Sequence, residues 1–348
     1  MAPAFFWSGE RMQSRISLEP GLSIMRVASN LAGLCVLRNA RDLVGLVCGH
    51  YLRIGLTHIR FIDDGSSDDS YEFLSRLARK EKRISVTRLS TPIFRQQELM
   101  SETANELQRC GFTMILPFDI DEFWHVSGPL LEARYARHSE ISFSGRWINF
   151  VQNQTETQAA PARLLNVKYS APALDDADQD AVTSFRRPFV CVSETKVAFK
   201  AARPVQLDWG QHRLLIGPEY RDPSRYEIFH LPFRCRGEIL TRALDHEPRR
   251  ALMRDSASNA WQSLFFREAV LANRIDELWH ANSADSDGFL NCGGERIPLV
   301  RDYRLRSVLL KAAAYLALRH PWVLVSRPTI GNYYSTARIA GGRLPAKH

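Results

Sequence analysis

The sequence lacks paired cysteines, long apolar runs and internal repeats. None of its six cysteines belongs to a C-x-x-C pair, and several lie inside apolar runs such as L-C-V-L. A free thiol in such a run behaves as a small hydrophobic side chain, which argues against a zinc site and predicts a reducing, cytoplasmic compartment. No run reaches the ~18–20 apolar residues of a membrane span. The first residues lack the basic and apolar regions of a signal peptide, so we expect none.

Acidic residues are nearly absent from the C-terminal end. Residues 301–348 hold nine Lys and Arg against one acid, Asp302, and the whole chain carries a net charge of +8, so the first 300 residues are neutral. An apolar stripe predicts a helix over residues 304–319, with its basic residues off the stripe or at its ends. This helix could contact an anionic membrane, or pack on the rest of the chain with a basic outer face. No recognition motif supports nucleic-acid binding.

Apolar runs and helical periodicity alternate along the first part of the chain. Strands are predicted at residues 31–37, 58–62, 84–89 and 113–118, and helices at 43–54, 71–78 and 96–109. This order is typical of a parallel sheet covered by helices, and it predicts an α/β fold. The pattern changes after Trp124, where strands are predicted at residues 141–151, 163–169 and 196–200, followed by helical periodicity at 260–273.

Two acidic turns follow predicted strands. Asp63 and Asp64 come after the second strand, and Asp119, Asp121 and Glu122 come after the fourth. Ligands of parallel sheets bind at the carboxyl ends of the strands, where both turns should lie. Clustered carboxylates repel one another, so a cation must offset them or one must stay protonated. Carboxylates on alternating residues can hold Mg²⁺ or Mn²⁺ and leave positions open for phosphate oxygens, although a helix cap with solvated charge is the simpler alternative.

Three blocks of sequence together resemble a known family. They are V-L-R-N-A-R-D (36–42), G-H-Y-L-R-I-G-L-T-H-I-R-F-I-D-D-G-S-S-D-D-S (49–70) and L-P-F-D-I-D-E-F-W (116–124). They are similar to GT-A glycosyltransferases of the family 2 type, in the branch related to family 92. Weaker matches are W-I-N-F (147–150), K-V-A-F-K…H (196–212) and I-F-H-L-P-F-R-C-R-G-E-I-L (228–240). The resemblance implies a GT-A, Rossmann-like, mostly parallel sheet flanked by helices, with a C-terminal helical extension.

The resemblance also implies a domain division and a reaction. Residues 1–30 would be an arm, 31–245 the GT-A domain (31–124 the nucleotide-sugar half, 125–245 the acceptor half), and 246–348 a basic helical extension. The enzyme would move a sugar from a UDP- or GDP-sugar to a saccharide or lipid-linked acceptor, with inversion and with Mn²⁺ or Mg²⁺. Two departures stand out: Ala40 replaces a glutamate of the family, and residues 151–158 replace its G-S-x-G segment.

The roles of individual residues also follow from the resemblance. Asp63 or Asp64 would contact the base or ribose, Asp119 the ribose and metal, and Asp121 would be the main metal ligand. Glu122 would bind the acceptor or orient its neighbour. Arg38 and Asn39 belong to the nucleotide-binding start of the first block. His212 would complete the metal site, with His230 as a second choice, against a structural role for either.

No motif identifies the general base that an inverting transfer needs. Asp208, beside Trp209, is the first choice and Glu194 the second. Arginines 234, 236 and 242 could hold phosphate or form a solvated face. Two other functions remain open. D-x-D after a strand also resembles haloacid-dehalogenase-type phosphatases, with Asp119 as nucleophile, and the missing glutamate at Ala40 would suit a protein that binds a nucleotide-sugar or membrane surface without turnover.

Overall fold

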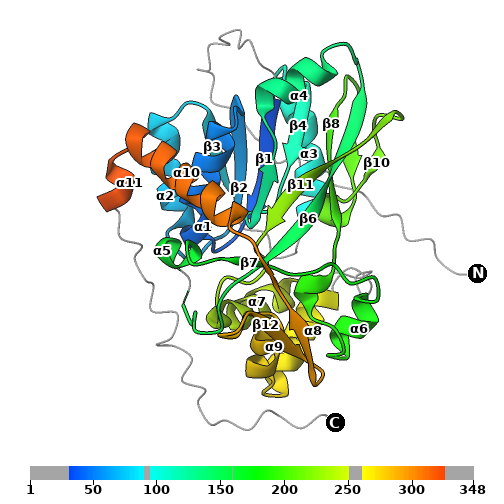
Figure 1. The fold of residues 1–348 in the computed structure, drawn as a ribbon. Helices are drawn as coiled ribbons and strands as arrows, with labels where there is room; N and C mark the ends of the chain where they lie inside the picture. The colour runs from blue at the N-terminus through cyan, green and yellow to red at the C-terminus, as the bar shows by residue number, and fades with distance from the viewer. Residues whose placement is uncertain (1–30, 90–94, 159, 251–260, 326–348) are drawn as a thin grey trace, which may run out of the picture.

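The computed structural model describes residues 31–89, 95–158, 160–250 and 261–325. The predicted arm at residues 1–30 and the last residues, 326–348, lie outside the described part. A ten-stranded sheet dominates the fold, with the order β14-β7-β6-β8-β4-β1-β2-β3, and β11 lies against β6 and β5. Helices flank this sheet, and a smaller group of elements lies below it in Figure 1.

The first half of the sheet is parallel, as predicted. β1 pairs with β2 and β4, and β2 pairs with β3, all in parallel. β1 is almost wholly buried, as its continuous apolar run requires. Gly55 follows α1 with a φ of 103°, a backbone conformation that glycine adopts at no steric cost. The elements are β1 (Leu31–Leu37), α1 (Arg41–Arg53), β2 (His58–Asp64), α2 (Ser70–Lys80), β3 (Ile84–Leu89), α3 (Gln96–Arg109) and β4 (Met114–Pro117).

The second half of the sheet is largely antiparallel. β8 lies between β4 and β6 and runs antiparallel to both, whereas β11 is parallel to β6 and antiparallel to β5. The α/β fold is therefore confirmed, but the sheet is mixed, and its parallel order is confined to β1–β4 and the β6–β11 pair. The elements are β5 (Glu122–His125), α4 (Gly128–Tyr135), β6 (Ile141–Val151), β7 (Tyr169–Ser170), β8 (Thr195–Lys200), β9 (Gln206–Leu207), β10 (Leu214–Ile216), β11 (Arg221–His230) and β14 (Val300–Arg301).

One predicted strand, residues 163–169, is wrong. Pro161 lies in the first turn of a short helix, α5 (Pro161–Leu164), and only Tyr169 and Ser170 join the sheet. The fixed φ of proline favours the start of a helix, and this local preference outweighs the apolar pattern that follows.

A second apolar core lies below the sheet and forms what we call the lower lobe. Phe185, Phe189, Phe233, Phe266 and Trp279 are among its buried side chains. Its elements include α6 (Gln179–Thr183), η1 (Phe189–Cys191), α7 (Arg236–Arg250), α8 (Trp261–Leu271), α9 (Ile275–Ala281), β12 (Phe289–Cys292) and β13 (Glu295–Pro298). The predicted domain boundary at residue 245 falls inside α7. This lobe matters for function because α7 reaches back to the acidic turn.

The chain returns from the lower lobe to the sheet through β14 and α10 (Arg304–Arg319), and α11 (Trp322–Val325) follows. The predicted helix over residues 304–319 is confirmed. Its apolar stripe, which includes Leu305, Leu309 and Leu316, is buried, and Ala312 contacts the position of Gly49 in α1. No helix within the described residues is long and apolar enough to cross a membrane.

Candidate functional site

The acidic turn between β4 and β5 is closed by its own side chains. The backbone N–H of Asp119 donates to Glu122 Oε2 (2.8 Å), and the N–H of Glu122 donates to the carbonyl of Asp119 (3.0 Å). The Tyr51 hydroxyl donates to the Glu122 carbonyl (2.9 Å). Phe118 and Phe123 on either side are fully buried. The apolar flanks therefore anchor the turn and hold its carboxylates at the carboxyl end of β4.

Lys196 of β8 is the cation that the clustered carboxylates require. Its ammonium group donates to Asp119 Oδ2 and lies 3.2 Å from Glu122 Oε1, and the side chain is fully buried. Gln96 donates to the other Asp119 oxygen (2.8 Å), and Gln211 accepts from Lys196 (3.2 Å). Burial alone would lower the pKa of Lys196, but the two carboxylates raise it above its ordinary value. The ammonium group therefore stays charged.

Glu122 is the member of the cluster that is closed off from solvent. The indole N–H of Trp147 donates to its Oε1 (2.7 Å), and its side chain has no exposed surface. Burial raises the pKa of Glu122 to about 8; Lys196 opposes this shift, and Asp119 adds to it. This position suits an orienting role within the turn, the second of the two roles predicted for Glu122.

Asp121 faces His230 across a short gap. The amide nitrogen of Asn149 donates to the carbonyls of Val190 (2.9 Å) and Val192 (2.6 Å), so its Oδ1 faces His230 Nδ1 at 2.7 Å and accepts from it. The proton therefore lies on Nδ1, and the unprotonated Nε2 lies 3.8 Å from Asp121 Oδ1. Burial, and next the charge of Lys196, hold the pKa of His230 well below its ordinary value, so the ring is neutral.

This pair fits a divalent cation. A carboxylate oxygen and an unprotonated imidazole nitrogen lie at a distance too long for a hydrogen bond, and Asn149 fixes the tautomer as outer partners of metal ligands do. Among the described residues no group of three or more His, Cys, Asp or Glu could close a metal cage. Two protein ligands would leave positions open for phosphate oxygens.

An alternating chain of charges ties the acidic turn to the lower lobe. Arg234 pairs with Asp42 at the start of α1 (2.7 Å) and with Glu238 of α7 (2.6 Å). Arg242, one turn further along α7, pairs with Glu238 (2.7 Å) and with Asp121 Oδ2 (3.1 Å). Asp42, two residues after Ala40, has its carboxylate committed to this buried pair.

The turn after β2 is bound to the turn after β1. Arg38 donates to the carbonyls of Asp64 (2.8 Å) and Gly65 (2.9 Å), and Asn39 Oδ1 accepts from the backbone of Ser67 (2.8 Å). Arg38 and Asn39 therefore shape the predicted nucleotide-binding edge. Asp63 is fully buried, and burial raises its pKa. Its Oδ1 accepts from the backbone of Ser66 (3.1 Å), whereas its Oδ2 has no hydrogen-bond partner among the described residues.

The remaining predicted site residues lie on the loops around β8. Asp208 accepts from the backbone of Arg213 (3.0 Å) and pairs with its guanidinium (3.3 Å), which closes its own loop. Glu194 is exposed, and its backbone carbonyl accepts from the backbone N–H of Trp147 (2.9 Å). His212 Nδ1 lies 2.5 Å from the carbonyl of Thr195. The histidine that lies beside Asp121 is therefore His230, the second choice for the metal site, at 3.8 Å.

Three contributors to the site had weak signals in the sequence. Trp147 and Asn149 belong to W-I-N-F, and Lys196 opens K-V-A-F-K; both blocks carried the resemblance without a role for these residues. Trp147 and Asn149 alternate along β6, so both side chains leave the same face, and Trp147 stacks on His230 with a centroid distance of 4.1 Å. The sequence shows this alternation, but it does not show that β11, which carries His230, lies beside β6.

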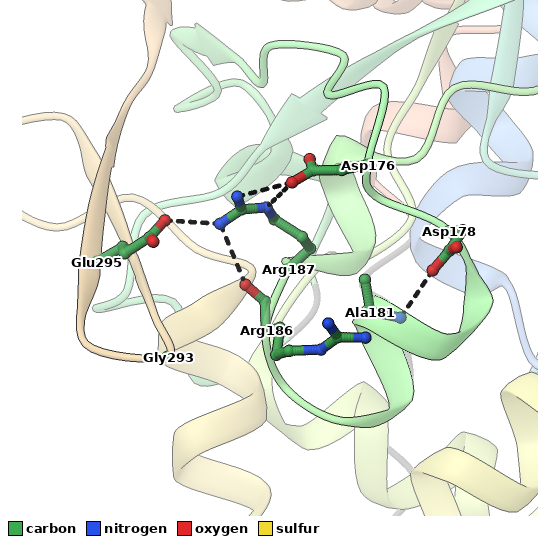
Figure 2. A pocket seen from close by; sticks show the side chains of 7 residues that line it. All are labelled: Asp176, Asp178, Ala181, Arg186, Arg187, Gly293 and Glu295. Carbon is green, nitrogen blue, oxygen red and sulfur yellow. Dashed lines mark hydrogen bonds and ion pairs between the residues drawn. The ribbon is translucent and has the colours of Figure 1, made fainter.

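A cavity of about 400 Å³ lies in the lower lobe, away from the acidic turn (Figure 2). Figure 2 shows Arg187 between Asp176 (2.7 Å) and Glu295 (2.6 Å), so these lining charges compensate one another. None of the residues predicted to act in binding or catalysis lines this cavity. Its lining is Asp176, Asp178, Ala181, Arg186, Arg187, Gly293 and Glu295.

Comparisons with known proteins give only distant likenesses. No family model and no curated protein matches the chain. Among solved structures, TarS 1–349 of S. aureus is 11% identical (85% of this chain, 92% of that chain, TM-score 0.33). The mannosyltransferase PcManGT from Pyrobaculum calidifontis, in complex with GDP-Man and Mn²⁺, is 13% identical (85% and 82%, TM-score 0.35). GalNAc-T7 with UDP, GalNAc and Mn²⁺ is 16% identical (35% and 24%, TM-score 0.28). Likenesses this low assign neither a family nor an activity to the chain.

Proposed function

We propose that this protein is a glycosyltransferase that moves a sugar from a UDP- or GDP-sugar to a saccharide or lipid-linked acceptor, with inversion. The observation that carries the proposal is the acidic turn after β4, where Asp121 faces the neutral His230. The Asp63–Asp64 turn ends β2 in the same sheet, and only β1 lies between β2 and β4. The two turns therefore lie at one sheet edge, as a nucleotide with a diphosphate would need.

Asp63 is our proposed contact to the nucleobase. Its Oδ2 is a buried acceptor with no hydrogen-bond partner among the described residues, and leaving such a group unpaired costs about 1–3 kcal/mol. An N–H group of uracil or guanine would satisfy it. Asp64 and Asp119 remain proposed contacts to the ribose.

Asp121 and His230 would hold the divalent cation, Mn²⁺ or Mg²⁺. When bound, such an ion neutralises the charge that develops on the leaving diphosphate. Lys196 holds the Asp119 carboxylate in place, and Glu122 and Trp147 hold the turn in its shape. These residues hold the site in its shape before the reaction begins, so that the site does not have to rearrange as charge develops.

Glu194 and Asp208 remain the proposed general bases. Asp208 is paired with Arg213, which favours a role in its loop, whereas the exposed Glu194 lies two residues before Lys196. A base must reach the acceptor hydroxyl directly or through one water, so we now place Glu194 first.

The phosphatase alternative is less well supported. It needs an oxygen of Asp119 free to attack phosphorus, but both carboxylate oxygens are bonded, one to Gln96 and one to Lys196. Loss of phosphate release from a generic monoester in Asp119→Asn would support this alternative.

Calorimetry with UDP and GDP, with and without Mn²⁺, tests the proposal. We expect binding of one nucleotide that Mn²⁺ strengthens, and we expect His230→Ala to weaken the Mn²⁺-dependent part about 10–100-fold, as loss of a metal ligand or its support does. His212→Ala serves as the matched control and should retain it. A protein that binds neither nucleotide under either condition is not a nucleotide-sugar transferase. Binding without donor hydrolysis or transfer would instead favour a non-catalytic binding protein.

We also propose that the outer face of α10 contacts an anionic membrane. Leu318 is 84% exposed and Leu310 46%, and Arg306 and Lys311 are exposed on the same helix. Exposed leucines beside basic side chains suit a surface of anionic headgroups over acyl chains.

A further inference from the structure

The segment from Arg234 to Arg242 holds three arginines with different surroundings. Arg234 is buried and forms ion pairs with Asp42 and Glu238. Arg236 pairs with Asp276 on the exposed side of the lower lobe. Arg242 is the one that touches the acidic turn, and its side chain is 24% exposed. The three residues thus separate into a buried support, a surface pair and a partly exposed cation at the site.

Arg242 can change partners without unfolding its surroundings. Its Nε donates to Glu238 Oε1 (2.9 Å) within α7, which holds the side chain, and its Nη2 reaches both Glu238 (2.7 Å) and Asp121 Oδ2 (3.1 Å). Its Nη1 makes no hydrogen bond to a described residue. The guanidinium group therefore has one edge fixed by the helix and another edge available to an anion.

The charges around Arg242 favour such an exchange. Two groups of ion pairs meet at the acidic turn: Lys196 with Asp119 and Glu122, and Arg234 and Arg242 with Asp42, Glu238 and Asp121. Together they hold five carboxylates and three cations. Lys196 and Arg234 are buried and held by two carboxylates each, whereas Arg242 is partly exposed and within reach of an incoming anion.

We propose that Arg242 binds the diphosphate of the donor nucleotide, exchanging its contact with Asp121 for one with phosphate oxygens. The planar guanidinium fork matches phosphate in bidentate geometry, and charge-assisted hydrogen bonds of this kind are strong. The exchange frees Asp121 Oδ2 at the moment when the diphosphate arrives. This inference rests on the proposed function, because it assigns the phosphate-binding residue of that same site.

The test compares a nucleotide with its phosphate-free nucleoside. Binding of UDP and uridine, or of GDP and guanosine, is measured by calorimetry and NMR titration in the presence of Mn²⁺. We expect Arg242→Ala to weaken the diphosphate about 10–100-fold, the range of a charge-assisted hydrogen bond, and to leave the nucleoside within about twofold. Arg242→Lys keeps the charge but loses the fork, so its diphosphate affinity should lie between the two.

Arg236→Ala is the matched control, since it removes the same side chain from the same helix away from the acidic turn. It should bind both ligands like the unaltered protein. Equal weakening of nucleotide and nucleoside by Arg242→Ala would show a structural role and overturn the inference, as would unchanged diphosphate binding. If Arg242→Ala fails to fold in thermal unfolding measurements, the comparison is made with Arg242→Lys, whose unchanged UDP or GDP affinity would equally overturn it. An unaltered protein that binds neither nucleotide fails the proposed function itself.

Discussion

At the scale of single residues, Lys196 balances the negative charge of the acidic turn. Clustered carboxylates after a buried strand require a cation or a proton, and the structure supplies the cation: the Lys196 ammonium group lies between Asp119 and Glu122. The D-x-D-E motif alone leaves open which cation, or which proton, offsets its charge. The structure assigns the internal charge balance to Lys196, and we propose Asp121 and His230 as the metal-binding pair.

Replacing Lys196 should destabilise the fold more than an ordinary surface lysine does. Lys196→Met leaves the buried Glu122 and the partly exposed Asp119 without their cation, and breaking a buried pair costs about 3–5 kcal/mol. Lys200→Met on the same strand is the control, because among the described residues Lys200 donates only to the carbonyls of Tyr135 (3.2 Å) and Ala136 (3.4 Å). The loss of stability in Lys200→Met should be about 1 kcal/mol. Urea unfolding measures both, and equal losses would contradict the role given to Lys196.

At the scale of elements, close contact between α1 and α10 joins the C-terminal helix to the sheet. A Cβ at Gly49 would lie 2.2 Å from the carbonyl oxygen of Ala312, whereas a Cβ at Gly45 would lie 3.4 Å from Phe73. The two glycines lie one turn apart in the same helix, yet only Gly49 faces the backbone of α10. Periodicity predicts both helices but does not reveal that they touch.

Gly49→Ala should therefore destabilise the protein, although alanine is the better helix former. Forcing the two backbones apart costs about 1–3 kcal/mol, which exceeds the gain of about 1 kcal/mol from helix propensity. Gly45→Ala gains the propensity without the clash and should be neutral or stabilising. Thermal unfolding of both variants checks this. Stabilisation by Gly49→Ala would show that α10 does not pack this closely.

At the scale of the whole molecule, the basic C-terminal end of the chain includes α10, which covers α1. The excess of basic residues after residue 300 begins with a helix whose apolar stripe is buried and whose outer face carries Arg306, Lys311 and Leu318. Removing this helix would uncover the apolar surface of α1, so deletion cannot test a membrane contact. Single exposed residues can.

Leu318→Glu should reduce cosedimentation with phosphatidylserine vesicles about tenfold, since it removes an apolar anchor and adds a charge that anionic lipid repels. Leu130→Glu is the matched control, because Leu130 is also highly exposed (71%) but lies on α4. It should bind vesicles like the unaltered protein. If both variants lose binding equally, or if the unaltered protein does not bind, α10 is only a packed helix with a basic outer face.

The sequence by itself determined the helices and strands of the parallel half and both acidic turns. Their signals are local: apolar runs, 3.6-residue periodicity and turn residues lie within a few positions of the features they predict. The tertiary structure alone decided what stands opposite the carboxylates. Lys196 is 77 residues from Asp119 and Arg242 is 121 residues from Asp121. The contact of Lys196 depends on β8 entering the sheet between β4 and β6. The position of His230 likewise depends on β11, which pairs His230 with Asn149 of β6. A pattern along one strand shows which face is buried, but it does not show which strand lies beside it.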